Sequence, residues 1–304
     1  MTKPILIAGP TASGKSALAL AIAQRVGGVI VNADSMQVYR ELAVLTARPT
    51  PADTALVPHR LYGHVAGAEG YSAGRYVREA GAAIEEVRAK GRSAIVVGGT
   101  GLYFKALLEG LSPVPEVAPR VRARWRSQAE RVSAETLHRE LAIRDPVTAR
   151  RLQPGDRQRV LRALEVIDAT GRSLTDWHRE PSVHVLNAAD VQLLVVLPER
   201  DTLYRRCDAR FDAMMRAGAL DEVRRLAALG LAGDLPIMGA LGVSPLAAHL
   251  AGRQSLEDAA TQAKAQTRQY AKRQLTWLRK HMMSWRVVNL EQNNIENIIK
   301  DIKV

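Results

Sequence analysis

Apolar residues in the first hundred positions gather in short runs, and the segments between these runs repeat their apolar residues at helical spacing. The pattern predicts helices over Lys15–Arg25 and from an N-cap at Ser72 to Arg88. Short buried strands that alternate with helices indicate an α/β fold, in which helices cover both faces of a parallel sheet. The predicted strands are Pro4–Ala8, Val29–Asn32, Ala94–Val97 and Val191–Leu197.

The pattern changes between residues 114 and 189, where strand signals vanish and arginine becomes frequent. Proline-containing segments flank this stretch, as expected for connections into and out of a separate unit. We predict an α/β core with basic C-terminal helices, a helical insertion that binds RNA, and a tail rich in Asn, Ile and Lys. Their limits are residues 1–113 and 190–288 for the core, 114–189 for the insertion and 289–304 for the tail.

The composition narrows the class of protein. A chain of 304 residues with 47% hydrophobic residues can bury a large core, yet no apolar run approaches the ~20 residues that span a bilayer. No signal segment precedes the first predicted strand, and the single cysteine, Cys207, suits a reducing compartment. We therefore expect a cytoplasmic protein with no membrane partner. We take it as a monomer, because the sequence carries no interface signal. The net charge of +12 favours a polyanionic partner.

A phosphate-binding loop is predicted directly after the first strand. Two glycines separated by four residues and followed by lysine and serine form the P-loop pattern. Its backbone N–H groups can surround a phosphate, Lys15 supplies a positive charge, and Ser16 can hold Mg²⁺. The predicted diphosphate-binding residues are Gly9, Pro10, Thr11, Ala12, Ser13, Gly14, Lys15 and Ser16.

Asp34 is the candidate general base. It follows the second predicted strand, and the carboxyl ends of parallel strands share one edge, so Asp34 should face the same crevice as the P-loop. A carboxylate there can accept a proton, hold Mg²⁺ through water, or cap the next helix. The run Ala94–Val97 ends in glycines without an acidic residue, which weakens the interpretation as a nucleotide hydrolase.

A basic stripe is predicted near the C-terminal end of the core. The segment Ala259–Leu290 contains seven Lys or Arg residues and no acidic residue. Lys264, Arg268, Lys272 and Arg279 are spaced by 4, 4 and 7 residues, which places them on one side of a helix. An uncompensated stripe of this kind suits contact with an RNA backbone.

Several motifs together resemble those of the bacterial tRNA dimethylallyltransferases. The resemblance spans about Pro4 to Arg286. It implies a P-loop nucleoside-triphosphate-hydrolase-like parallel sheet flanked by helices, with an all-helical insertion domain. It also implies transfer of dimethylallyl from dimethylallyl diphosphate to the N6 amine of the adenosine 3′ of the anticodon, with release of diphosphate. The motifs are Gly9–Ser16, Asp34–Tyr39, Thr46–Thr50, Gly98–Tyr103, Asp156–Arg159 and Thr267–Arg279.

The resemblance also implies roles for individual residues. Asp34 would act as the base, with Lys15, Thr11 and Arg210 around the diphosphate and Mg²⁺ on Ser16. Three further tRNA contacts are predicted from the charge of the basic stripe and not from the resemblance. They are Arg268, Lys272 and Arg279. The residues implied to meet the tRNA anticodon stem-loop are Asp34, Ser35, Met36, Gln37, Thr100, Arg122, Gln158, Arg159, Val160, Leu161 and Arg162.

The sequence departs from the family pattern in four places. Leu45 replaces a usual glycine, and Arg48 replaces a common lysine. Residues 62–68 and 238–245 are atypical, and the resemblance implies no particular contacts for residues 238–245.

Other functions share parts of this pattern. A small-molecule or nucleotide kinase would use the P-loop and Asp34, but it needs no basic stripe. A nucleotide-dependent RNA-binding switch would explain the charge and leave Asp34 without a task. An enzyme that prenylates free adenine nucleotides would need no helical insertion. We therefore favour the enzyme that acts on tRNA.

Overall fold

The computed structural model describes residues 2–182, 184–292 and 294–302, and it contains a six-stranded sheet in the order β3-β2-β4-β1-β5-β6. All neighbouring strands of this sheet run parallel. The predicted α/β fold is therefore confirmed, and the four predicted strands lie within one residue of their observed limits. The strands are β1 (Ile5–Ala8), β2 (Val29–Asn32), β3 (His59–Arg60), β4 (Ala94–Gly98), β5 (Gln192–Val196) and β6 (Arg286–Val288).

The two strands that the sequence pattern missed, β3 and β6, form the edges of the sheet. Both are short, and each carries an exposed arginine, Arg60 in β3 and Arg286 in β6. An edge strand pairs on one side only and is often short and charged, so it lacks the apolar run that marks a central strand.

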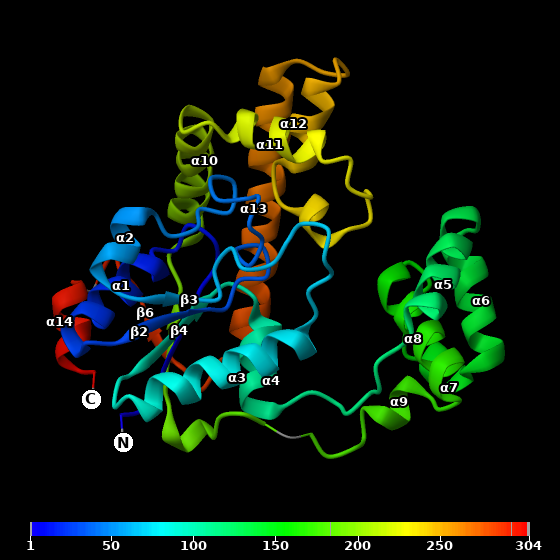
Figure 1. Ribbon diagram of the computed structural model, residues 1–304, viewed down its shortest axis with the longest axis horizontal. Coiled ribbons are helices and arrows are strands. Elements are labelled where there is room, and N and C mark those ends of the chain that lie inside the picture. Colours follow the sequence, from blue (N-terminus) through cyan, green and yellow to red (C-terminus); the bar gives the residue numbers. More distant parts are fainter. Residues whose placement is uncertain (1, 183, 293, 303–304) are drawn as a thin grey trace. The chain divides into compact units, whose positions relative to one another are not determined.

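Helices cover both faces of the sheet (Figure 1). Alternate strand residues point to opposite faces, so that Leu6 packs with α3, α4 and the end of α13, whereas Ile5 and Ile7 pack with α1 and α14. The helices of this unit are α1 (Lys15–Val26), α2 (Pro51–Leu56), α3 (Ala73–Ala89), α4 (Gly101–Glu109), α10 (Arg200–Arg216), α11 (Ala219–Ala228), α12 (Val243–Leu250), α13 (Leu256–His281) and α14 (Ile295–Lys300), with 3-10 turns η1 (Ala188–Asp190) and η2 (Pro236–Gly239).

A separate apolar cluster joins the chain after β2 to the C-terminal helices. Leu42 and Leu45 are buried in it together with Phe211 of α10, Val223 of α11 and Leu246 of α12. The loop that follows Asp34 is therefore packed against helices that lie far away in the sequence.

The chain folds as two compact units, one formed by residues 1–108 and 185–304 and the other by residues 109–184. The second unit begins and ends five residues earlier than the predicted insertion, at 109 instead of 114 and at 184 instead of 189. Its described residues form helices and no strand. The helices are α5 (Pro119–Arg131), α6 (Ala134–Arg144), α7 (Pro146–Ala149), α8 (Arg157–Thr170) and α9 (Leu174–Trp177).

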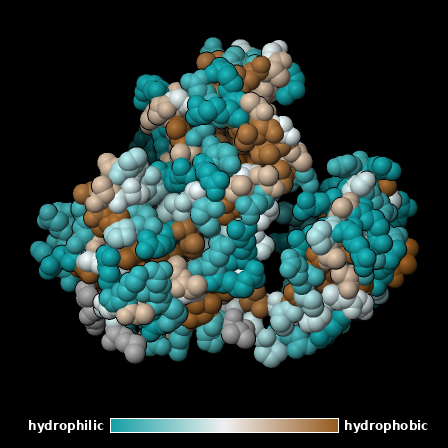
Figure 2. Space-filling model, in the orientation of Figure 1, coloured by the Kyte–Doolittle hydropathy of each residue, from teal (hydrophilic) through white to brown (hydrophobic). Residues whose placement is uncertain are grey.

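Trp125 is the largest side chain in the core of the helical unit, and it is fully buried. The guanidinium groups of Arg124 and Arg144 lie 5.5 and 5.4 Å from its ring centre, within the range of cation–π attraction. Hydrophilic residues cover most of this unit in Figure 2, which agrees with the exposed arginines of α5.

The C-terminal segment packs on the core and is not a free tail in its described part. Ile298 and Ile302 are 3% and 8% exposed, in the same cluster as Ile5, Ile7 and Leu18. The polar composition of residues 289–304 conceals these contacts, because α14 needs only one apolar side to pack against α1. Within the described residues, no helix is long and apolar enough to cross a bilayer.

Replacement of a single residue measures how much this terminal helix stabilises the core. We expect Ile298→Ala to lower the free energy of unfolding by about 3 kcal/mol, because it leaves a cavity beside the sheet. Asn297→Ala, at an exposed position of the same helix, should change it by less than about 0.5 kcal/mol. Urea unfolding followed by circular dichroism provides both values, and equal effects would show that α14 does not stabilise the core.

Candidate active site

The P-loop joins β1 to α1 in a conformation that small residues permit. Gly14 and Ala12 have left-handed backbone angles, with φ of 90° and 60°. A Cβ atom on Gly9 would lie 2.7 Å from Ser13 Oγ, closer than the loop allows. Gly14 caps α1 without a side chain, so the positive end of the helix faces the loop and favours an anion there.

Lys15 folds back onto the P-loop. Its Nζ donates a hydrogen bond of 3.0 Å to the carbonyl oxygen of Pro10, and the residue is only 9% exposed. Burial lowers the pKa of Lys15 to about 8, while the charge of Asp34 opposes this shift and the charge of Arg210 adds to it. An anion bound in the loop would replace Pro10 as the partner of Lys15 and favour its charged form.

Asp34 is oriented by the buried side chain at the end of β2. Asn32 accepts a hydrogen bond of 2.8 Å from the amide of Asp34 and donates one of 2.9 Å to its carbonyl oxygen. Asp34 Oδ1 in turn accepts a hydrogen bond of 2.9 Å from the amide of Met36. The carboxylate thus projects from a fixed turn at the end of β2. The alternative role as a cap of the next helix is wrong, because residues 33–50 contain no helix and the next one, α2, begins at Pro51.

Thr100 ties the Asp34 loop to the end of β4. Its hydroxyl oxygen accepts a hydrogen bond of 3.0 Å from the amide of Ser35, and its own amide donates to the carbonyl oxygen of Ala33. A side chain on Gly98 would overlap with the backbone of Ala33, so only glycine allows this approach. The structure therefore brings Thr100 and Asp34 together, as expected for two strand ends at one edge.

The negative charge of Asp34 shifts the pKa values of several nearby side chains. Its negative charge raises the pKa of Lys15 and Arg210, in both cases against the larger lowering caused by burial. Burial and then the charge of Asp34 raise the pKa values of Tyr62 and Tyr270. The predicted catalytic residues Asp34, Lys15 and Arg210 thus form one charged group at the carboxyl edge of the sheet.

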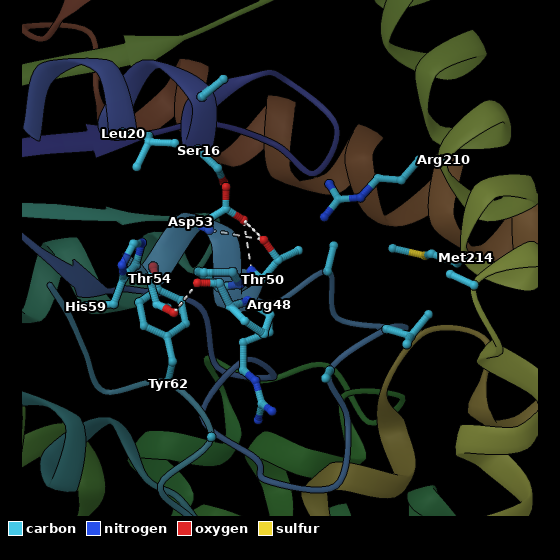
Figure 3. Close-up of a pocket in the computed structure, with 18 of the residues that line it drawn as sticks. Ser16, Leu20, Arg48, Thr50, Asp53, Thr54, His59, Tyr62, Arg210 and Met214 are labelled. Carbon is cyan, nitrogen blue, oxygen red and sulfur yellow. Dashed lines mark hydrogen bonds between the residues drawn. The ribbon is translucent and has the colours of Figure 1, made fainter. Parts of the chain in front are cut away.

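A cavity of about 990 Å³ opens beside Arg210, whereas Lys15 and Asp34 are not among the residues that line it (Figure 3). Ser16 and Leu20 of α1 form one side of it, and Arg210 and Met214 of α10 form another. The rest is lined by residues between Ala43 and Thr54 and by the segment from His59 to Gly63. Cationic and hydroxyl groups therefore stand next to the apolar side chains of Ala43, Val44 and Ala47, in a cavity that the carboxylate of Asp53 also lines. Such a cavity can hold a molecule with one anionic end and one apolar end.

Thr11 lines a second, smaller cavity together with Arg210 and Phe211. Arg210 thus contributes to both cavities, and Figure 3 shows its side chain directed from α10 into the larger one. This placement is consistent with the predicted contact between Arg210 and an anion in the P-loop.

Gln274 is a buried residue of this site that the sequence analysis did not single out. Its Oε1 accepts a hydrogen bond of 2.8 Å from the amide of Thr11, and its Nε2 donates one of 2.8 Å to the carbonyl oxygen of Gly99. One side chain of α13 therefore fixes both the P-loop and the loop that carries Thr100. Its only signal in the sequence was its place within the motif Thr267–Arg279.

The basic stripe on α13 is compensated over half its length, so the prediction of an uncompensated stripe is wrong. Lys264 forms an ion pair of 2.6 Å with Asp212, and Arg268 contacts both carboxylate oxygens of Asp208 at 2.6 and 2.8 Å. The two acidic residues lie on α10, outside the segment Ala259–Leu290 from which the stripe was predicted. Lys272 and Arg279 are exposed and remain candidates for contact with RNA.

The candidate RNA contacts of the helical unit are exposed to different degrees. Gln158 and Arg159 are exposed at the start of α8, and Arg162 lies next to Glu165 and near Arg122. Leu161 is partly buried in the core of the unit. Val160 is fully buried there, which corrects its assignment, because its side chain packs inward and cannot touch RNA.

The departures from the family pattern lie against one another in pairs. Leu45 packs on Gly242 of the atypical segment 238–245, where an added Cβ would lie 3.1 Å from it. Arg48 packs on Gly63 of the atypical segment 62–68, and a side chain on Gly63 would overlap with its guanidinium group. Each larger residue thus meets a glycine that leaves room for it.

Comparison with known proteins identifies the family. The model of the IPP transferase family matches residues 37–281, and that of the isopentenyl transferases matches residues 2–65. The chain belongs to the IPP transferase family. Members named tRNA dimethylallyltransferase include one from Bradyrhizobium sp. (strain ORS 278), 54% identical over 99% of this chain and 97% of that protein. Another, from Rhodopseudomonas palustris (strain BisB18), is 58% identical over 91% and 88%.

Solved structures of IPP transferases have the same fold. The tRNA isopentenylpyrophosphate transferase of Bacillus halodurans is 30% identical, with a TM-score of 0.71 over 99% of this chain and 95% of that one. A eukaryotic dimethylallyltransferase acting on tRNA gives a TM-score of 0.84 at 27% identity, over 98% and 78%. The resemblance inferred from the motifs is confirmed, and the family supports a prenyltransferase over a kinase or an RNA-binding switch.

Gln274 provides a direct test of how the P-loop is held. We expect Gln274→Met to weaken the binding of inorganic diphosphate about tenfold, because the amide of Thr11 and the carbonyl of Gly99 lose their partner. Gln269→Met, the same change at an exposed position of α13, should leave the binding unchanged. Titration calorimetry measures both dissociation constants, and unaltered binding in Gln274→Met would contradict this role.

Proposed function

We propose that the protein transfers a dimethylallyl group from dimethylallyl diphosphate to the N6 amine of the adenosine 3′ of the anticodon in tRNA and releases diphosphate. The observation that carries the proposal is that Asp34 acts electrostatically on Lys15 and Arg210, and that Arg210 also lines a cavity with apolar side chains. A kinase would also need the anion site and the carboxylate, so the family of the chain decides in favour of the prenyltransferase.

The P-loop and its neighbours would hold the diphosphate of the donor. When the allylic C–O bond breaks, its electron pair leaves with the diphosphate, and the charge that develops there is stabilised by the loop amides, Lys15 and Arg210. Thr11 and Ser13 contribute to the shape of the loop. The dimethylallyl end would lie against the apolar side chains of the cavity, away from water.

A divalent metal ion suits this family of enzymes, and we propose Mg²⁺. The residues fit the ion, because the exposed hydroxyl of Ser16 lines the cavity and offers an oxygen ligand. In the described part of the chain no three His, Cys, Asp or Glu side chains gather at one point, which fits an ion held mainly by substrate phosphates and water. When bound, Mg²⁺ would neutralise charge on the leaving diphosphate.

Asp34 would accept the proton of the acceptor. The N6 amine of adenine is a weak nucleophile because its lone pair is shared with the ring, and loss of a proton to Asp34 as the N–C bond forms makes attack easier. The turn fixed by Asn32 and Met36 would hold the carboxylate ready for this transfer.

The adenosine must leave its stack in the anticodon loop before it reaches Asp34. We propose that Ser35, Met36, Gln37 and the hydroxyl of Thr100 receive the flipped nucleotide, since all of them border the Asp34 turn. Contacts with the RNA backbone would come from exposed or partly exposed side chains. These are Arg122, Gln158, Arg159, Arg162, Lys272 and Arg279, whereas Arg268 would first have to leave Asp208.

Removal of the base tests the proposed chemistry. Purified protein with bulk tRNA, Mg²⁺ and radiolabelled dimethylallyl diphosphate should place label in the RNA. Asp34→Asn should lower kcat by about 10²- to 10⁴-fold while the protein still binds the donor, because it removes the proton acceptor and little volume. Absence of label with the wild type, together with consumption of ATP in a parallel reaction, would favour the kinase.

The lowered pKa of Lys15 predicts how donor binding depends on pH. Lys15 is protonated below its pKa of about 8 and loses its charge above it. Above about pH 7, where the diphosphate has lost its last proton, the dissociation constant for dimethylallyl diphosphate should stay level to about pH 8 and then rise, by as much as about tenfold per pH unit. Lys15→Arg keeps its charge and should give a level profile to about pH 10. The same profile in both proteins would contradict this role.

A further inference from the structure

Glu222 is a buried carboxylate that neither the P-loop nor the proton transfer uses. It lies in the first turn of α11 and is 3% exposed. Its two oxygens accept three backbone hydrogen bonds, at 2.6 Å from the amide of Ala43, 2.9 Å from Val44 and 2.9 Å from Leu45. These donors are consecutive residues of a loop far from α11 in the sequence.

This arrangement stabilises a charge that would otherwise be costly to bury. Successive backbone N–H groups form a concave site for an anion, and here the anion is part of the protein. The N-terminal end of α11 adds a favourable dipole to the same carboxylate. Among the described residues, Glu222 forms no ion pair with Lys or Arg, so the loop amides are its main partners.

The loop held by Glu222 supplies apolar side chains to one wall of the cavity. Ala43 and Val44 line it, as do Ala47 and Arg48 a few residues later. Gln37 holds the same loop at its later residues. Its Nε2 donates hydrogen bonds of 2.8 and 3.1 Å to the backbone carbonyl oxygens of Thr46 and Ala47. Ala47 has a left-handed φ of 48°, a conformation that needs such support.

We propose that Glu222 is a positioning residue for the prenyl donor. It fixes the loop of Ala43–Leu45 so that Ala43 and Val44 form a rigid surface for the dimethylallyl group, and this surface limits the length of the chain that fits. The inference rests on the proposed function, since it takes the donor to be an allylic diphosphate. Glu222 touches neither the reacting atoms nor the P-loop, so it acts through the position of the wall.

Glu222→Gln tests this role with almost no change in volume. A carboxylate can accept all three hydrogen bonds, whereas an amide has one acceptor oxygen and turns a donor NH₂ group toward an N–H. The matched control is Asp221→Asn, the same type of change one residue earlier, where the carboxylate is exposed and pairs with Arg224. Glu222→Asp is a second variant, which keeps the charge and shortens the side chain.

In Glu222→Gln, hydrogen exchange at the amides of Ala43, Val44 and Leu45 should become at least about tenfold faster. KM for dimethylallyl diphosphate should rise about tenfold with kcat within about threefold, and the preference for dimethylallyl over geranyl diphosphate should fall about tenfold. Asp221→Asn should match the wild type in all three measurements. Glu222→Asp should lie between them, and it serves as the test variant if Glu222→Gln does not fold.

The outcomes separate this inference from the proposed function. Faster amide exchange together with unchanged KM and donor preference would overturn the inference and leave the function in place. A fall in kcat alone would also overturn it, because a merely structural residue lowers the active fraction without changing KM. If the wild type transfers no label to tRNA, the proposed function fails. The effect of Glu222→Gln on the binding of both diphosphates, measured by calorimetry, then decides the inference.

Discussion

The close approach of three loops at the carboxyl edge of the sheet is the constraint on which the rest of the site depends. The amide of Gly9 donates to the carbonyl oxygen of Gly98, and the backbone of Ala33 lies where a side chain on Gly98 would be. This contact brings the P-loop and the Asp34 turn to the end of β4. A residue with a Cβ atom at position 98 would push the Asp34 turn away from the end of β4.

Buried polar side chains hold this junction from both sides. Asn32 fixes the turn of Asp34 from within the sheet, and Gln274 fixes Thr11 and Gly99 from α13. Each has both its acceptor and its donor satisfied, which is what allows a polar group to be buried without a large loss of stability. The geometry of the site is therefore set by amides that carry no charge. The charged residues Lys15, Asp34 and Arg210 are not needed to hold this junction, and Lys15 can exchange its hydrogen bond to Pro10 for one to a substrate.

Carboxylates have contrasting tasks in this unit. Asp208 and Asp212 neutralise cations of α13, and Glu222 holds a loop through its backbone. Asp34 stands among cations and tyrosines without an ion pair within 4.0 Å in the described structure, so its charge acts on several groups at once. This difference in surroundings is the physical reason to regard Asp34 as the reactive carboxylate.

Local pattern determined the central strands, the P-loop and the position of Asp34, because each depends on residues that are neighbours in the chain. A buried strand needs an apolar run, and a P-loop needs its glycines and lysine at fixed spacing. Edge strands β3 and β6 lacked such a run, and α14 was concealed by polar composition. The neutralisation of Arg268 by Asp208, the burial of Val160 and the contacts of Gln274 and Glu222 were decided by tertiary structure alone. Each of these pairs residues from elements that only packing brings together, and charge or spacing along the chain cannot show which partner a buried polar group will meet.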